Sequence, residues 1–233
     1  MNNNEFNADA AALSVDLSEA RQAVKENRFQ DALDLFKIIL ETDPDHIDSL
    51  YLASVSSRYL KKFDESKKYI ERLLFIAPDM GRAYQELGHI HRDMGNLAKA
   101  AIHYRQACEL NPALLASWNY LYKYFVESKN KPAADHARGQ IEKLQSLPPA
   151  LLYIDQIMNE GRLGIAETQC RAFLKKNPTH TYAMSLLSEI ANRLGYFDDA
   201  EFLLEKAVEF EPNDGELRMK YAQILRKKQK FAK

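Results

Sequence analysis

The stretch GRAYQELGHIHRDMGNLAKAAIHYRQACELNP, residues 81–112, decides the fold because its pattern recurs along the chain. Apolar residues at spacings of three and four lie on both sides of Gly95, and each side predicts an amphipathic helix. Gly95 can take the left-handed conformation that ends the first helix. Pro112 closes the second helix because it removes a backbone donor. The small side chain of Ala100 lets the two helices approach closely, so the stretch predicts a helix–turn–helix unit.

These features repeat with a period of 34 residues, apart from the middle of the chain, where one closing proline is missing and two residues are lost. The closing prolines are Pro44, Pro78, Pro112, Pro178 and Pro212. A single helix pair cannot bury its apolar face alone, so the units must stack. The sequence therefore predicts an all-α fold, a right-handed α-solenoid of six complete helix pairs and one unpaired helix, with no strand.

The fourth repeat is irregular in the segment SKNKPAADHARGQIEKLQSLPP, residues 128–149. Lys131 replaces the aromatic or leucine residue of the turn, and Arg138 replaces the core aromatic residue of the second helix. We still expect a second helix here, with thinner packing than in the neighbouring repeats. Two interpretations remain open: a hinge between repeats one to four and five to seven, or sequence drift that a stacked array tolerates.

The domain organisation predicted from this pattern has three parts. We expect residues 1–12 to be a flexible leader, because the start of the chain is rich in asparagine and chain termini are often poorly ordered. Residues 13–146 hold repeats one to four, of which the fourth is degenerate. Residues 147–233 hold repeats five and six and the first helix of a truncated seventh repeat.

Composition excludes several classes of function. Lysine and arginine number 32 and aspartate and glutamate number 33, so no overall field favours nucleic acid or a membrane surface. No run approaches the ~18 apolar residues of a membrane span, and the N-terminus lacks the features of a signal peptide. Two cysteines, Cys108 and Cys170, do not make a disulfide framework and are interpreted as core residues. We therefore expect a cytoplasmic protein.

The sequence offers no catalytic, metal or cofactor site. His89 and His91 are two residues apart and point in different directions on a helix. Neither a His-Glu-x-x-His nor a Cys-x-x-Cys spacing occurs, and the glycines are scattered singly instead of forming a phosphate loop. We expect no enzymatic activity from this chain.

The expected ligand surface is the concave face, which the first helices of a stacked array line. In repeats two to four its predicted partner-binding residues are Tyr51, Arg58, Arg82, Gln85, His89, Arg92, Asn119 and Lys123. The basic members predict an acidic or carboxylate-bearing protein or peptide as partner, and one member of each repeat (Tyr51, Gln85, Asn119) adds a row for hydrogen-bonding an extended backbone. The corresponding positions of repeats five and six, which include Asp155, make the second half of the groove mixed to acidic.

The repeated residues resemble the tetratricopeptide repeat, whose pattern is W-x2-L-G-x2-Y, then A-x3-F, A and P at this period. The third repeat matches it best, at Tyr84, Leu87, Gly88, Gly95, Ala100, Tyr104, Ala107 and Pro112. The resemblance implies a scaffold that binds proteins or peptides. The chaperone-tail clamp known in this family is not matched, because Glu86 stands among the positions that would supply basic residues.

From Trp118 onward the chain resembles the N-terminal array of bacterial tetratricopeptide–sulfotransferase fusions. The segments SWNYLYKYFVESKNKPAADHA, LPPALLYIDQIMNEGRLGIAETQCRAFLKKNP and LLSEIANRLGYFDDAEFLLEKAVEFEPND carry this resemblance. It implies a following domain that uses 3′-phosphoadenosine-5′-phosphosulfate. The repeat pattern itself breaks off within repeat seven, one residue before the expected small residue of a second helix, so we expect a truncation at Lys233 and an uncapped last helix that is open to self-association. The alternative is a free-standing adaptor or co-chaperone without a catalytic domain.

Overall fold

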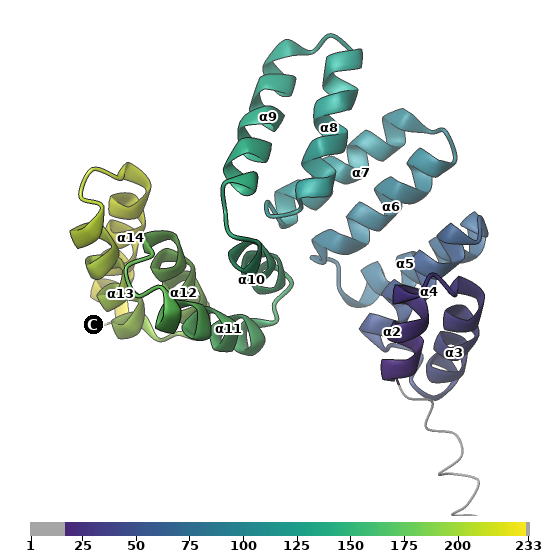
Figure 1. The fold of residues 1–233 in the computed structure, drawn as a ribbon, viewed down its shortest axis with the longest axis horizontal. Helices are drawn as coiled ribbons and strands as arrows, with labels where there is room; N and C mark the ends of the chain where they lie inside the picture. Colours follow the sequence, from purple (N-terminus) through teal and green to yellow (C-terminus); the bar gives the residue numbers. More distant parts are fainter. Residues whose placement is uncertain (1–16, 232–233) are drawn as a thin grey trace, which may run out of the picture. The chain divides into compact units, whose positions relative to one another are not determined.

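The computed structural model describes residues 17–231, and the predicted leader at residues 1–12 lies outside this range. Every regular element in the described range is an α-helix (Figure 1). The helices are α2 (Leu17–Lys25), α3 (Phe29–Thr42), α4 (Ile47–Tyr59), α5 (Phe63–Ile76), α6 (Gly81–Asp93), α7 (Leu97–Leu110), α8 (Leu115–Glu127), α9 (Lys131–Gln145), α10 (Pro149–Asn159), α11 (Leu163–Lys176), α12 (Thr181–Leu194), α13 (Phe197–Phe210) and α14 (Gly215–Phe231). The prediction of an all-α array of stacked helix pairs is confirmed.

The turn inside each helix pair contains one residue in the left-handed conformation. Gly95, Gly161 and Gly195 have φ angles of 79°, 77° and 84°, as the sequence pattern predicts. Asn27 takes the same conformation in the first repeat, with φ of 59°. In repeats two and four the left-handed residues are lysines, Lys61 and Lys129. A lysine accepts this conformation only at a cost in free energy, so packing on both sides must hold these two turns.

Small residues set the close approach of the helices within a pair. Ala32, Ala100, Ala166 and Ala200 are fully buried at the predicted contact position. Ser66 holds that position in repeat two, where its hydroxyl donates a hydrogen bond of 2.8 Å to the carbonyl of Ser54 across the pair. The hydrogen bond satisfies a polar group that burial would otherwise make costly.

The described chain divides into two compact units, and the boundary lies between Arg138 and Gly139, inside α9. We call them unit 1, up to Arg138, and unit 2, from Gly139. In each unit the buried apolar clusters are shared by successive repeats, so stacking and not the single pair buries the core. The sequence pattern places its own division after residue 146, and that division stays a prediction.

The fourth repeat departs from its neighbours in the spacing of its helices. In repeat three α6 and α7 make the most extensive backbone approach of any pair, whereas α8 and α9 lack a comparable approach. Gly88 explains the first case, because a Cβ at this position would lie 2.8 Å from the ring of Tyr104. Repeat four has Tyr122 where repeat three has Gly88, and Arg138 where repeat three has Tyr104. Repeat four therefore lacks the glycine that allows the close approach in repeat three.

Candidate partner-binding site

The eight predicted partner-binding residues lie on the first helices of three successive repeats in unit 1. We call the surface that these residues share the first-helix face. Tyr51 and Arg58 come from α4, four further residues come from α6, and Asn119 and Lys123 come from α8. Contacts between helices join most of them, and their exposure differs widely.

Arg58 is the most buried member, with its side chain 8% exposed. Its Nε donates a 2.6 Å hydrogen bond to Oε1 of Glu86, and its Nη1 donates a 2.9 Å bond to Oδ2 of Asp93. Glu86 itself is 1% exposed. The sequence predicts Arg58 as a solvated or ligand-binding cation, and the solvated interpretation is wrong. Two acidic residues of α6, next to the positions counted as inward, reach the same face and enclose the guanidinium.

The electrostatics of this cluster favour a charged Arg58 and a neutral His89. Burial opposes the charge on Arg58, but attraction and hydrogen bonds to Glu86 and Asp93 outweigh it and raise the pKa of the guanidinium. Burial, together with the nearby Arg58 and Arg92, lowers the pKa of His89 to about 4. The Nδ1 atom of His89 hydrogen-bonds the hydroxyl of Tyr104 and lies 3.3 Å from Nη1 of Arg92. Since an arginine can only donate, this nitrogen acts as an acceptor.

The row predicted to hydrogen-bond an extended backbone is partly engaged inside the protein. The guanidinium carbon of Arg82 lies 4.4 Å from the centre of the Tyr51 ring, which stacks a cation of α6 on α4. The amide of Gln85 donates to the hydroxyl of Ser117 on α8 at 2.9 Å. Asn119 donates to the carbonyl of Leu115 in its own helix at 3.0 Å. No hydrogen bond to the amide oxygen of Gln85 or Asn119 occurs within residues 17–231.

Arg92 and Lys123 are the exposed cations of the first-helix face. Arg92 is 40% exposed and donates to Oδ1 of Asp93 at 2.7 Å. Lys123 is exposed on α8, and no ion pair to it occurs within residues 17–231. The carboxylates of Glu86 and Asp93 pair with Arg58 and Arg92, which leaves Lys123 as the cation of this face without an ion pair in the described range. Its positive excess is smaller than the sequence pattern alone predicts.

The first-helix face of unit 2 differs from its prediction at Asp155. The sequence pattern places Asp155 on an exposed surface, and that placement is wrong because Tyr182 of the next repeat covers the carboxylate. The Tyr182 hydroxyl donates to Oδ2 at 2.7 Å, and Asn159 donates to Oδ1 at 2.9 Å. Burial raises the pKa of the Asp155 carboxyl although both hydrogen bonds act against the shift. Asp155 therefore stabilises a repeat junction.

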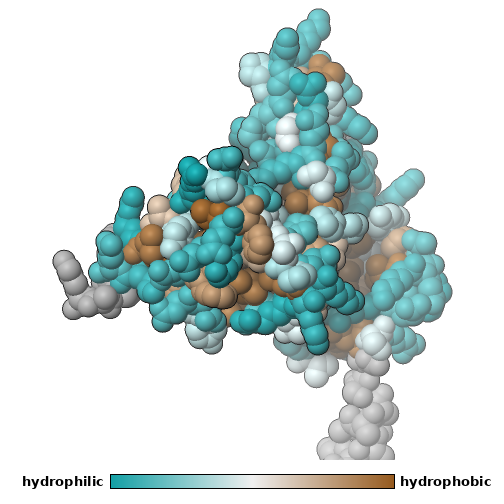
Figure 2. Space-filling view, turned by 60° about the vertical axis from the view of Figure 1, so that its left-hand side comes forward, coloured by the Kyte–Doolittle hydropathy of each residue, from teal (hydrophilic) through white to brown (hydrophobic). Residues whose placement is uncertain are grey.

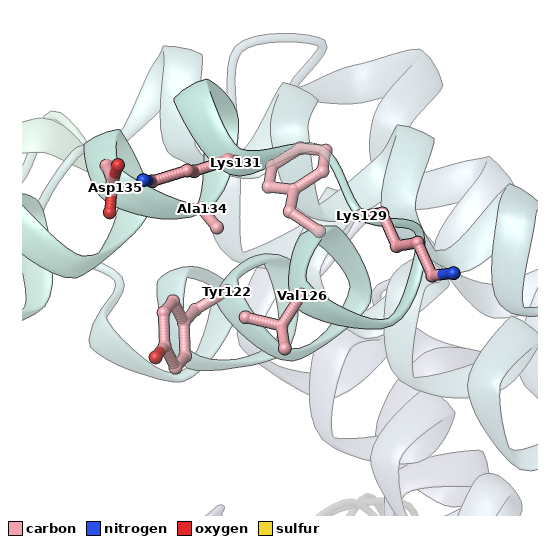
Figure 3. Close-up of a pocket in the computed structure, with 7 residues that line it drawn as sticks. Tyr122, Val126, Lys129, Lys131, Ala134 and Asp135 are labelled. Atoms are coloured by element: carbon pink, nitrogen blue, oxygen red, sulfur yellow. The ribbon is translucent and has the colours of Figure 1, made fainter.

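Repeat four of unit 1 contains a hollow that the sequence analysis does not predict (Figure 3). Its volume is about 340 Å³, which is at the small end of ligand pockets. Figure 3 shows Tyr122 and Val126 of α8 on one side and Ala134 of α9 on the other. Phe125, Lys129, Lys131 and Asp135 complete its lining. The sequence feature that indicates the hollow is Lys131. In the other repeats an aromatic or leucine side chain occupies this position.

The described residues were searched for metal-binding clusters, reactive cysteines and membrane spans. Within residues 17–231, no cluster of three or more histidine, cysteine or acidic side chains is placed to hold a metal. Cys108 and Cys170 are buried, as predicted, and burial raises the pKa of each thiol to about 12. None of the helices in this range has both the length and the apolar character of a membrane span.

The surface of the described residues is largely polar with apolar patches. Figure 2 shows hydrophilic residues over most of the visible face, with hydrophobic residues between them. Phe75 on α5 is the most exposed large apolar side chain in the described range, at 89%. It lies on a second helix, away from the first-helix face, and singly exposed apolar residues are common on protein surfaces.

The family model of the tetratricopeptide repeat matches two segments of the chain, residues 81–114 and 182–214. These segments are tetratricopeptide repeats. The first comprises α6 and α7 with the Gly88–Tyr104 contact, and the second comprises α12 and α13 with the left-handed Gly195 between them. The remaining helix pairs have the same turn geometry, with one left-handed residue between their two helices.

Several solved structures are similar to this chain. MamA 41-end from Desulfovibrio magneticus RS-1 is 20% identical, over 57% of this chain and 77% of that chain, with a TM-score of 0.48. YrrB, described as a tetratricopeptide repeat protein with an unusual peptide-binding site, is 20% identical over 96% and 97%, with a TM-score of 0.40. TTC0263 from Thermus thermophilus is 21% identical over 90% and 96%, with a TM-score of 0.41.

Proposed function

We propose that this chain is a non-catalytic scaffold of tetratricopeptide repeats that binds an acidic segment of another protein on the first-helix face of unit 1. The observation that carries the proposal is the arrangement of charge on that face. Arg58, Arg92 and Lys123 come from the first helices of three successive repeats and stand against the two carboxylates of Glu86 and Asp93, and Lys123 has no ion-pair partner in the described range. The carboxylates of an acidic segment would neutralise the remaining positive charge of this face.

The buried ion pairs support this proposal by fixing the positions of the exposed groups. Arg58 and Glu86 lock α4 to α6, and Gln85 ties α6 to α8 through Ser117. The exposed Arg92 and Lys123 therefore lie on a surface whose helices are held in register before a ligand arrives. Preorganisation of this kind lowers the entropic cost of binding.

The test is a selection from a display library of random peptides, with the intact chain as bait. The selected peptides should be enriched in aspartate and glutamate, and their affinity should fall as salt rises, because exposed charges are screened over about 8 Å at physiological ionic strength. Selection of neutral or basic peptides, or an affinity that is independent of salt, would contradict the proposal.

The resemblance of residues 118–233 to the arrays of sulfotransferase fusions favours a second, finer proposal. In it the array recognises the acceptor of a sulfotransferase domain encoded downstream in a bacterial, cytoplasmic protein. Translation of the reading frame beyond the codon of Lys233 tests it. A phosphosulfate-binding domain in that frame would support the fusion, and a stop codon would favour the free-standing adaptor.

A further inference from the structure

The hollow in repeat four is explained by what this repeat lacks. The other helix pairs that match the period supply an aromatic or leucine side chain from the first residue of the second helix: Phe29, Phe63, Leu97, Leu163 and Phe197. In repeat four that residue is Lys131, which is exposed. Figure 3 shows the Lys131 side chain extending along α9 toward Asp135 and leaving the space beside Tyr122 and Val126 unfilled.

The walls of the hollow are apolar, and part of that surface is open to solvent. Val126 is 52% exposed, Phe125 is half-buried, and Ala134 forms a small floor at 6% exposure. Ring and branched aliphatic surfaces left open in this way gain free energy when another apolar group covers them. A volume of about 340 Å³ has room for one ring-bearing side chain with its neighbouring backbone.

The rim of the hollow adds a charge preference. Lys129 and Lys131 line it, and the single lining carboxylate, Asp135, is paired with Arg138 at 3.1 Å. Lys129 lies in the left-handed turn between α8 and α9, with φ of 57°, and Figure 3 shows its ammonium group directed away from Tyr122 and Ala134. A carboxylate at this rim would be attracted by the two lysines, whereas a cation would be repelled.

We infer that the hollow between α8 and α9 binds an aromatic side chain of the partner, next to a carboxylate, and so receives from another protein the group that the other repeats supply themselves. This inference rests on the proposed function and names a specificity site within it. The acidic segment on the first-helix face would extend past Lys123 and place one ring in the hollow, since Lys123 and Val126 are one turn apart on α8.

The first test uses small probes and does not depend on any partner. Amide NMR spectra of the intact chain are recorded during titration with phenylacetate, benzyl alcohol and benzylamine. Phenylacetate should shift the amides of residues 122–135, and benzyl alcohol should bind about five-fold more weakly, the factor expected for an exposed ion pair. Shifts spread over the whole chain, or equal binding of benzylamine, would overturn the inference.

Two variants and one control sharpen the result. Lys131→Phe restores the missing ring, so it should abolish the shifts from all probes. Lys129→Asn removes one charge while keeping a residue that tolerates the left-handed turn, so it should reduce phenylacetate binding and leave benzyl alcohol binding unchanged. Lys176→Phe, on the exposed end of α11, should have no effect. Unchanged phenylacetate binding by the Lys131→Phe protein would refute the site.

Repeating the peptide selection with the Lys131→Phe protein separates this inference from the proposed function. We expect the selected peptides to keep their acidic residues and lose their enrichment in aromatic residues. If the wild-type chain selects acidic peptides with no aromatic preference, the hollow is not a specificity site although the scaffold function stands. If it selects no acidic peptides while phenylacetate still binds at residues 122–135, the proposed function fails and the hollow remains a ring-binding site.

Discussion

At the scale of single residues, Arg58 shows how a predicted ligand-binding cation can instead belong to the interior. Its guanidinium bridges Glu86 and Asp93, and both Arg58 and Glu86 are almost completely buried. Counting inward positions along the helices predicts Arg58 as a residue of this face. This counting did not predict the ion pairs of Arg58, because it places only the Cα atom of a residue. The long arginine side chain extends from there to the acidic residues of the next first helix. Glu86 and Asp93 were missed for the same reason.

The first prediction concerns this ion pair. Arg58→Ala should destabilise unit 1 by about 3–5 kcal/mol, because it leaves the buried carboxylate of Glu86 without its counter-ion. Replacing both residues together, as Arg58→Met with Glu86→Met, should restore most of the loss since no buried charge remains. Urea unfolding of the three proteins measures the difference. Equal losses in the single and double variants would show that the pair is not the cause.

A second prediction follows from the histidines of repeat three. Burial, with additional repulsion from neighbouring cations, lowers the pKa values of His89, His91 and His103, and that of His89 falls to about 4. As the pH falls, these histidines become protonated in the unfolded chain before they do in the folded chain. The free energy of unfolding is therefore highest above about pH 6.5 and declines as the pH falls toward 4. The wild-type protein loses free energy of unfolding between pH 7 and pH 5, and His89→Gln should make this loss smaller by roughly 1–2 kcal/mol.

The same unfolding experiment with His136→Gln serves as the control for the histidine prediction. His136 is exposed on α9, where it packs edge-on against Trp118. Comparing the two variants separates the contribution of His89 from the effect of replacing a histidine as such. A His89→Gln protein whose stability still falls as steeply as the wild-type between pH 7 and pH 5 would contradict the assignment of that loss to His89.

Two glycines give a third prediction with a built-in comparison. Gly88→Ala should destabilise the protein by about 1–3 kcal/mol, because the added methyl group would press on the Tyr104 ring. Gly139→Ala should stabilise it by about 0.5–1 kcal/mol, since this helical glycine has open space around its Cα and alanine favours the helix. Thermal unfolding of both variants measures the two signs. A stable Gly88→Ala protein would contradict the close packing of α6 and α7.

At the scale of the elements, the period of 34 residues was sufficient to predict every described helix pair, because the turn, the small contact residue and the closing proline each have a local physical cause. The structure adds what local pattern does not contain. Lys61 and Lys129 adopt left-handed turns without the glycine or asparagine that signals one. The separation of α8 and α9 was predicted only as thinner packing. Lys131 and Arg138 indicate which side chains are missing, but a list of missing side chains does not predict a hollow between the helices.

A fourth prediction tests that separation of the helices. Backbone amides in the part of α9 that belongs to unit 1 should exchange with deuterium faster than those of α7, because fewer packed side chains protect them. Lys131→Phe should slow the exchange in α9 and leave α7 unchanged, since the added ring fills the hollow. Hydrogen exchange measured by mass spectrometry resolves the two helices. Equal protection of α7 and α9 in the wild-type protein would contradict the account of repeat four.

At the scale of the whole molecule, the near-zero net charge hides differences between local surfaces. On the first-helix face of unit 1, cations outnumber carboxylates, whereas in unit 2 Asp155 is held by Tyr182 and Asn159. Charged side chains that have no ion pair within a repeat junction can pair with charged groups of a partner. The scaffold function proposed for this chain therefore depends on unit 1, and in particular on Arg92 and Lys123.

The most direct test of this claim measures the affinity of an acidic peptide from the library for two variants with the same change in charge. Arg92→Gln with Lys123→Glu alters the first-helix face, and Lys175→Gln with Lys176→Glu alters the exposed end of α11 in unit 2. Calorimetric titration should show binding weakened at least about ten-fold by the first pair, the sum of two or more exposed ion pairs, and almost unchanged by the second. Equal affinities for the two double variants would contradict the account.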